Sequence, residues 1–111
     1  MEINYELIKT VNEATNVMND LLAFRESVKT NIIDQKVISK NTNREGEIKD
    51  ITKKYLFLNY ECWGSVPISL DKYLNVVDIN QTTLNNINDY LATFNDERKL
   101  NTLVHKLSRN V

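Results

Sequence analysis

The central segment of the chain reads Tyr55-Leu56-Phe57-Leu58-Asn59-Tyr60-Glu61-Cys62-Trp63-Gly64-Ser65-Val66. It is rich in aromatic and large apolar residues, holds the only Trp of the sequence, and is followed at once by Pro67. This composition favours strands over helix. The segment has room for two strands of about five residues each, with a tight turn near Asn59 to Glu61. The sequence therefore predicts a β-hairpin over residues 55–67.

A lone hairpin of this kind needs a partner. Two strands by themselves are marginally stable in water and leave unpaired backbone groups at their edges. We therefore expect the hairpin to pair with other chains, the alternative being that it packs back on the helices of its own chain. The side chains predicted to form this subunit interface are Leu56, Phe57, Leu58, Tyr60, Trp63 and Val66.

Both flanks of the hairpin carry helical patterns. Before it, apolar residues recur in alternating steps of four and three from Leu7 to Ile32, which is the spacing of a coiled-coil seam. After it, a matching seam runs from Tyr73 to Arg98. The residues that most often break helices, glycine and proline, are concentrated near the middle of the chain. We expect one helix over about residues 4–52 and a second over about 69–109, with Ser69 as its N-cap.

The predicted fold class is therefore mainly α, a long antiparallel coiled-coil helical hairpin with a central β-hairpin, built as one domain over residues 1–111. The two helices would measure about 70 and 60 Å at 1.5 Å per residue, so they can pair along their length. Arg25 is a polar residue within the first seam, and Asn80 is one within the second. Such residues either fix the register of the helices or are merely solvated.

Composition limits the function. A chain of 111 residues has room for one domain. Its net charge of -1 gives no global field that would attract nucleic acid or an anionic membrane, and no apolar run is long enough to span a bilayer. The single cysteine, Cys62, and the absence of a signal-like beginning predict a reducing compartment, cytoplasmic or also nuclear. We expect no nucleic acid and no membrane as partners.

The order helix, central hairpin, helix resembles a beta-type subunit of the prefoldin-like family. The run Asp34-Gln35-Lys36-Val37-Ile38-Ser39-Lys40-Asn41-Thr42-Asn43-Arg44-Glu45-Gly46 resembles the end of the first helix in a member of that family, where an Asn-Arg-Glu-Gly step precedes the hairpin. The Val66-Pro67 step and the spacing of Leu84, Ile87 and Leu91 are similar too. The chain departs from the family by having Tyr60-Glu61 where a glycine turn is expected.

The resemblance implies a non-enzymatic chaperone or cochaperone subunit. In such hetero-oligomers the hairpins of several prefoldin-like subunits form a platform, and the coiled coils hold non-native or assembling client proteins at their tips. Exposed apolar residues at helix ends suit that task. The tips that would contact clients are Leu7, Ile8, Leu103 and Leu107.

Two other function classes stay open. One is a coiled-coil adaptor or tether, including one of viral origin; residues 55–66 buried within the monomer would favour it. The other is a small all-helical ribonuclease, since Arg98 and His105 fit its loose Arg-x6-His pattern. A Cys62–His105 nucleophilic pair is disfavoured by the apolar surroundings of the thiol. We expect no catalytic residue, no cofactor and no metal, because one Cys and one His cannot form a zinc site in a single chain.

Overall fold

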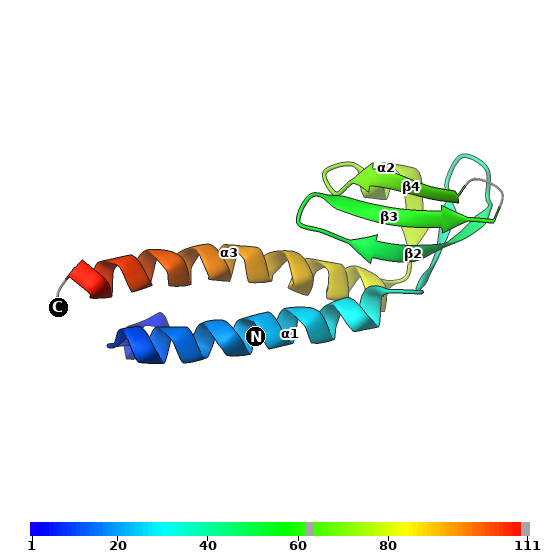
Figure 1. Ribbon diagram of the computed structural model, residues 1–111. Coiled ribbons are helices and arrows are strands. Elements are labelled where there is room, and N and C mark those ends of the chain that lie inside the picture. The colour runs from blue at the N-terminus through cyan, green and yellow to red at the C-terminus, as the bar shows by residue number, and fades with distance from the viewer. Residues whose placement is uncertain (62–63, 110–111) are drawn as a thin grey trace.

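The computed structural model describes residues 1–61 and 64–109. Two long helices, α1 (Val11–Ile32) and α3 (Gln81–Arg109), lie side by side and antiparallel, and an antiparallel sheet is attached to one end of the pair (Figure 1). The molecule measures 58 × 19 × 19 Å, with a radius of gyration of 17.3 Å. A compact domain of this length would have a radius of gyration of about 13 Å, so the elongated shape expected from the two seams is confirmed.

The sheet corrects the predicted fold class. It has five strands in the order β4-β3-β2-β1-β5, all antiparallel neighbours. A mainly α fold with a single central hairpin is therefore wrong. The predicted hairpin is present as β3 and β4, and the other strands lie where the helices were expected to continue. The remaining elements are η1 (Tyr5–Leu7), β1 (Lys36–Ser39), β2 (Glu45–Ile51), β3 (Tyr55–Tyr60), β4 (Gly64–Ser69), α2 (Tyr73–Val76) and β5 (Val77–Ile79).

The first helix is shorter than predicted because it has a cap at each end. Thr10 begins it, since its hydroxyl oxygen accepts a hydrogen bond from the backbone N–H of Glu13. Asp34 ends it by adopting a left-handed backbone, φ 68°, which short polar side chains tolerate. The backbone N–H of Asp34 then donates to the carbonyl of Ile48 at 2.7 Å. The chain therefore leaves the helix directly into the sheet, and residues 36–51 form β1 and β2.

The second long helix begins later than predicted. The Asn80 side chain accepts a hydrogen bond from the backbone N–H of Thr83 at 2.8 Å, so Asn80 is the N-cap of α3 and not a residue within a seam. Ser69, predicted to be the N-cap, is the last residue of β4. Between them the chain makes one turn of helix, α2, and the short strand β5 beside β1.

A glycine in β2 is explained by its neighbour on the next strand. Gly46 lies opposite Tyr60 of β3, and a Cβ atom at Gly46 would lie 2.8 Å from Cε1 of the Tyr60 ring. The ring therefore covers the glycine, which is buried. The Gly46 of the Asn-Arg-Glu-Gly step thus has a packing role within the sheet.

The main core lies between the inner face of the sheet and the sheet-proximal halves of the two long helices. Fully buried side chains reach it from β2 and β3, among them Ile48 and Leu58, and from the helices, among them Ile32 and Ile87. The sheet packs on its own helices, which was the alternative to intermolecular pairing.

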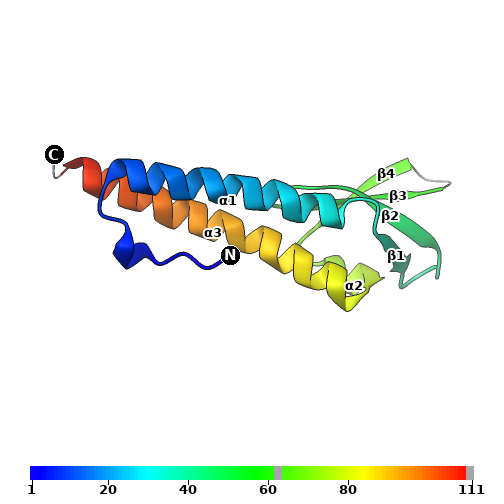
Figure 2. The same cartoon turned by 90° about the horizontal axis from the view of Figure 1, so that it is seen from below.

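A second core fills the other end of the helical pair. Ile8, Ala14, Leu21 and Leu100 are buried there, with Leu103 and Leu107 packed against them. The N-terminal segment folds back beside α3 (Figure 2), where the Tyr5 hydroxyl donates to Asp96 at 2.6 Å. Of the four predicted client-contacting tip residues, Leu7 is 70% exposed, whereas Ile8, Leu103 and Leu107 contribute to this core.

Candidate functional site

The two faces of the sheet differ in what covers them. Side chains alternate between the faces along each strand, and the inner ones, such as Val37, Ile48 and Leu56, are fully or almost fully buried. Most outer positions of β1, β2 and β5 are polar, as expected for an antiparallel sheet that faces water on one side. These polar positions include Lys36, Glu45, Glu47, Lys49 and Asp78.

The outer face of β3 and β4 breaks this rule. Tyr55 is 46% exposed and Phe57 is half-buried, although both lie on the solvent side of β3. Their ring centroids are 6.3 Å apart, and the exposed Pro67 of β4 lies opposite Phe57. We call Tyr55, Phe57 and Pro67 the outer patch. It is an apolar surface in a place where the rest of the sheet carries charge, and it is the candidate functional site.

The predicted interface residues divide between the two faces. Leu56 and Leu58 have no exposed surface and belong to the core of the monomer. Tyr60 and Val66 are half-buried, and Tyr60 packs against the same core. Phe57 is the residue of this set that the outer patch contains, and Trp63 lies outside the described residues. The hairpin therefore supplies one layer of the core and, on its other side, the outer patch.

Edge-to-edge pairing is restricted at β4. The described residues form a sheet whose outermost strands are β4 and β5. Pro67 sits in the middle of β4 and has no N–H to donate, and proline in an edge strand is a common device against pairing with further strands. β5 has three residues. A partner is therefore expected to contact the outer face of β3 and β4 and not to extend the sheet.

A polar layer separates the two cores of the helical pair. Arg25 of α1, whose side chain is 11% exposed, donates through Nε to Thr93 and through Nη1 to Glu97 of α3, at 2.8 and 3.1 Å. Its guanidinium carbon lies 3.8 Å from the centroid of the Phe94 ring. Within the described residues, Nη2 of Arg25 is buried without a hydrogen-bond partner. The register role proposed for Arg25 thus has a geometric basis, because these contacts exist in one alignment of the helices.

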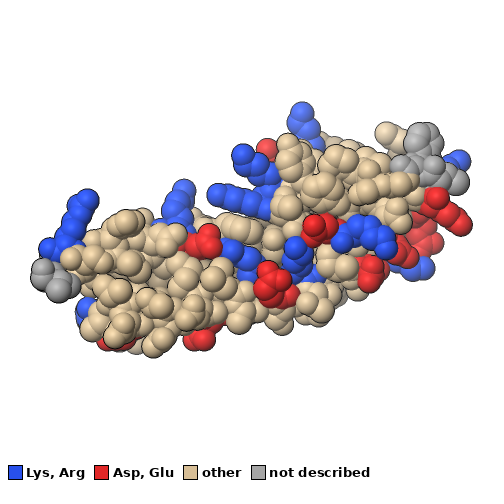
Figure 3. Space-filling model, viewed as in Figure 1, with Lys and Arg blue, Asp and Glu red and all other residues tan. Residues whose placement is uncertain are grey.

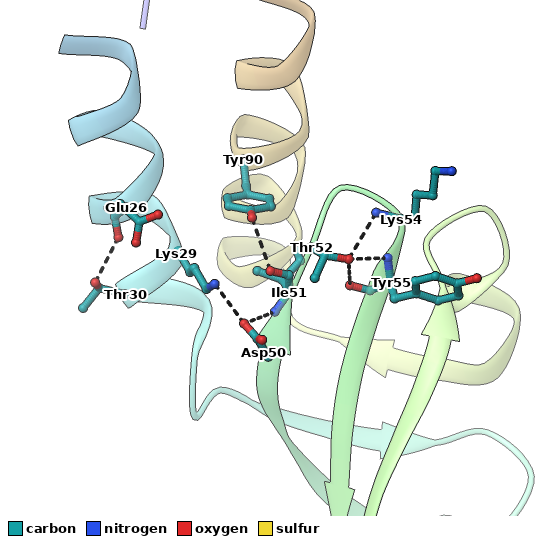
Figure 4. Close-up of polar contacts among 9 residues, drawn as sticks. All are labelled: Glu26, Lys29, Thr30, Asp50, Ile51, Thr52, Lys54, Tyr55 and Tyr90. Carbon is teal, nitrogen blue, oxygen red and sulfur yellow. Dashed lines mark hydrogen bonds and ion pairs between the residues drawn. The ribbon is translucent and has the colours of Figure 1, made fainter. Parts of the chain in front are cut away.

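A second set of polar contacts fixes the sheet to the helices (Figure 4). Lys29 of α1 pairs with Asp50 of β2 at 2.9 Å, and the Tyr90 hydroxyl of α3 donates to the carbonyl of Ile51 at 3.2 Å. Asp50 also accepts from the N–H of Ile51 at 2.8 Å. The Lys29 ammonium lowers the pKa of the Asp50 carboxyl, and the hydrogen bond to Asp50 raises the pKa of Lys29. Both helices are therefore tied to the end of β2.

The Lys29–Asp50 pair predicts a pH-dependent contribution to stability. A carboxyl whose folded-state pKa is lowered stabilises the fold above its unfolded value of about 3.9, and this contribution disappears as the pH falls through the folded pKa. Asp50→Asn keeps an oxygen for the Ile51 N–H and removes the charge. We expect it to lower the free energy of unfolding by up to about 1 kcal/mol at pH 7, since both groups are partly solvated, and by progressively less below pH 4.

Urea unfolding at several pH values measures this difference. Lys29→Met serves as the matched variant, because it removes the other half of the pair; combined with Asp50→Asn it should cost little more than either change alone at pH 7. A difference between wild type and Asp50→Asn that stays constant from pH 7 to pH 3 would contradict the assignment.

The residues of the ribonuclease pattern lie on the exposed side of α3. Arg98 donates to Asn95 at 2.7 Å, and both Arg98 and His105 are exposed. Each lines a shallow hollow on the surface, and the two hollows share Thr102 and Lys106. The five-stranded sheet departs from the all-helical architecture of the ribonucleases that the pattern resembles. Cys62 lies outside the described residues. Over residues 1–61 and 64–109, no group of three or more His, Cys, Asp or Glu side chains could hold a metal ion.

No family model matches the sequence, and no curated protein and no solved structure matches it either. The resemblance to the prefoldin-like family therefore stays a prediction that depends on the residues quoted for it. In the described part of the chain, no helix combines the length and the apolar character needed to cross a membrane.

The outer patch was only partly visible in the sequence. Phe57 was predicted to lie in an interface, whereas Tyr55 and Pro67 were not chosen. The signal was present in β3, where apolar residues occupy consecutive positions from Tyr55 to Leu58 and therefore both faces of a strand. A strand that buries only one face would instead alternate apolar residues with polar ones.

Proposed function

We propose that this protein is a non-enzymatic adaptor that binds a partner protein through the outer patch of its sheet. The observation that carries the proposal is the apolar cluster on the outer face of β3 and β4, where Tyr55, Phe57 and Pro67 are accessible, while most outer positions of β1 and β2 are charged. An accessible cluster of aromatic side chains next to polar surroundings is typical of protein-binding surfaces.

The rigidity of the scaffold supports this role. The strand that carries the two aromatic residues is paired on both sides, by β2 and by β4. Leu56 and Leu58, which alternate with them, are anchored in the core. The aromatic side chains are therefore held in place before a partner arrives, which reduces the entropy lost on binding.

The geometry supports an adaptor better than a chaperone subunit. A platform of paired hairpins would need free strand edges, whereas β3 is an inner strand and β4 contains Pro67. Holding clients at the helix tips would need exposed apolar residues there, and most of the tip residues pack against one another. The helical pair is better described as an arm that extends from the sheet, stiffened by a core at each end.

A pair of threonine replacements tests the proposal. Tyr55→Thr combined with Phe57→Thr removes both rings and keeps side chains that favour strands. We expect the tagged double variant, purified from its native cell, to lose the partners that the wild-type protein retains. Quantitative mass spectrometry of the co-purifying proteins measures this. The variant should keep the far-ultraviolet circular dichroism of the wild type.

Ile38→Thr is the matched control. Ile38 is 47% exposed on the same outer face, but it lies on β1, away from β3 and β4. This variant should retain all partners. The proposal fails if the double variant co-purifies with the same proteins in the same yield, or if Ile38→Thr loses as many.

A further inference from the structure

The last part of α3 carries charge of one sign. Residues 98–109 include Arg98, Lys99, Lys106 and Arg109 and contain no Asp or Glu. All four side chains are exposed. The net charge of -1 for the whole chain hides this local excess, because the acidic residues lie elsewhere. A sequence-wide charge balance therefore says little about this surface.

The nearest acidic residues along α3 already have partners. Asp96 accepts the hydroxyl hydrogen of Tyr5, and Glu97 pairs with Arg25. Both contacts lead to neighbouring segments, the N-terminal segment and α1. Glu97 is thus compensated by Arg25, whereas Asp96 keeps its charge. None of the four basic side chains forms an ion pair among the described residues. Figure 3 shows Lys and Arg atoms projecting from the side of the arm where α3 lies.

The surface beside these side chains is hollowed. One hollow of about 370 Å³ is lined by Arg98, Lys99 and Lys106, and a neighbouring hollow of about 660 Å³ by Lys106 and Arg109. A third, of about 300 Å³, lies in the corner between α3 and the turn that joins β2 to β3, where both Lys53 and Arg98 line it. Among the described residues, the linings of these three hollows contain no acidic side chain.

The three hollows form a track of neighbouring hollows along α3, in which adjacent ones share Arg98 or Lys106 as a lining residue. From Leu91 in the corner to Arg109 the track extends along α3 for about 27 Å at 1.5 Å per residue. We call Lys53, Arg98, Lys99, Lys106 and Arg109 the basic track. Four of these residues lie along α3, and Lys53 lies on the other side of the corner.

We propose that the basic track binds the sugar-phosphate backbone of a single-stranded nucleic acid. A linear polyanion matches a line of cations of this length, because its phosphates can lie beside successive basic side chains. The hollows also contain apolar surface, at Leu91, Phe94 and Leu103, against which bases can pack. This site is separate from the outer patch and does not depend on the adaptor role.

Salt dependence provides a quantitative test. If about four phosphates are contacted, the logarithm of the association constant should fall with the logarithm of the salt concentration with a slope of about -2.8. Binding of a fluorescent 20-nucleotide oligouridylate, measured by anisotropy, should therefore weaken about 50-fold between 50 and 200 mM salt. Because the proposal is binding without cleavage, the oligonucleotide should remain intact during the measurement.

Two glutamine replacements locate the site. Arg98→Gln with Lys106→Gln removes two phosphate contacts, so the slope should fall to about -1.4 and the affinity at 100 mM salt by about 25-fold. Lys36→Gln with Lys40→Gln is the matched control, since it removes the same charge from exposed positions in and beside β1. The control should leave both values unchanged.

Three results would overturn the proposal: no binding of the oligonucleotide at 50 mM salt, equal losses in the two double variants, or tighter binding of poly-glutamate or of vesicles containing phosphatidylserine than of the oligonucleotide. Circular dichroism of both variants verifies that they are folded, so a loss of binding can be assigned to the removed charges.

Discussion

Leu58→Ala is expected to lower the free energy of unfolding by about 2–5 kcal/mol. Leu58 has no exposed surface, and it lies on an inner strand, opposite Ile48 of β2 and Val66 of β4. Truncation leaves a cavity that the surrounding strands cannot fill without distorting their pairing. Urea unfolding followed by circular dichroism measures the loss.

This expectation replaces the one that followed from an intermolecular hairpin. If Leu58 contacted other subunits, a replacement there would release partners and leave the isolated chain as stable as before. Phe57→Ala provides the matched control, because Phe57 is the adjacent residue of β3 and points to the outer face. It should cost clearly less stability than Leu58→Ala, and equal costs would contradict the assignment of the two faces.

Glu97→Ala is expected to lower the free energy of unfolding by about 2 kcal/mol, because it removes the only carboxylate that pairs with Arg25 in the described structure. The Arg25 side chain is 11% exposed, so solvent cannot replace the lost partner fully. Its remaining contacts, the Thr93 hydroxyl and the Phe94 ring, carry no negative charge. Thermal and urea unfolding measure the effect.

Adding Arg25→Met to Glu97→Ala should recover stability. A methionine fills much of the same volume without a buried charge, and apolar replacements of buried ion pairs are often neutral or stabilising. The double variant is therefore expected to be more stable than Glu97→Ala alone. If it is less stable than either single variant, the polar layer does not act as a unit, and its role in holding the register of the two helices is disproved.

The helical seams could be predicted from the sequence because each is a repeat of apolar residues at steps of three and four, which involves only residues close together in the chain. The seam positions from Val11 to Ile32 lie in α1, and those from Leu84 to Leu91 lie in α3. The central hairpin was predicted for a similar reason, since aromatic and branched residues at consecutive positions favour strands wherever they occur. Asn59 and Tyr60, which were predicted to lie in its turn, belong to β3, since Asn59 pairs with Ser65 and Tyr60 with Gly64.

The strands β1, β2 and β5 were not predicted because the local sequence of these segments fits a helix as well as a strand. Residues 36–51 contain isoleucine and valine at intervals that fit a drifting helical stripe as well as a strand. What decides between them is Asp34, whose left-handed backbone ends α1, and its hydrogen bond to Ile48, which is distant in sequence. A contact of this kind forms only when β2 is already in place.

By itself, the sequence determined an elongated chain with two antiparallel helices and a strand pair between them, because period and composition act over a few neighbouring residues. The tertiary structure alone decided which face of each strand is buried, and therefore that Leu58 belongs to the core while Tyr55 and Phe57 remain accessible. It also placed Lys53 and Arg98 around one hollow. These arrangements depend on pairing between segments far apart in the chain, whose free energy is gained only when the sheet and both helices assemble together.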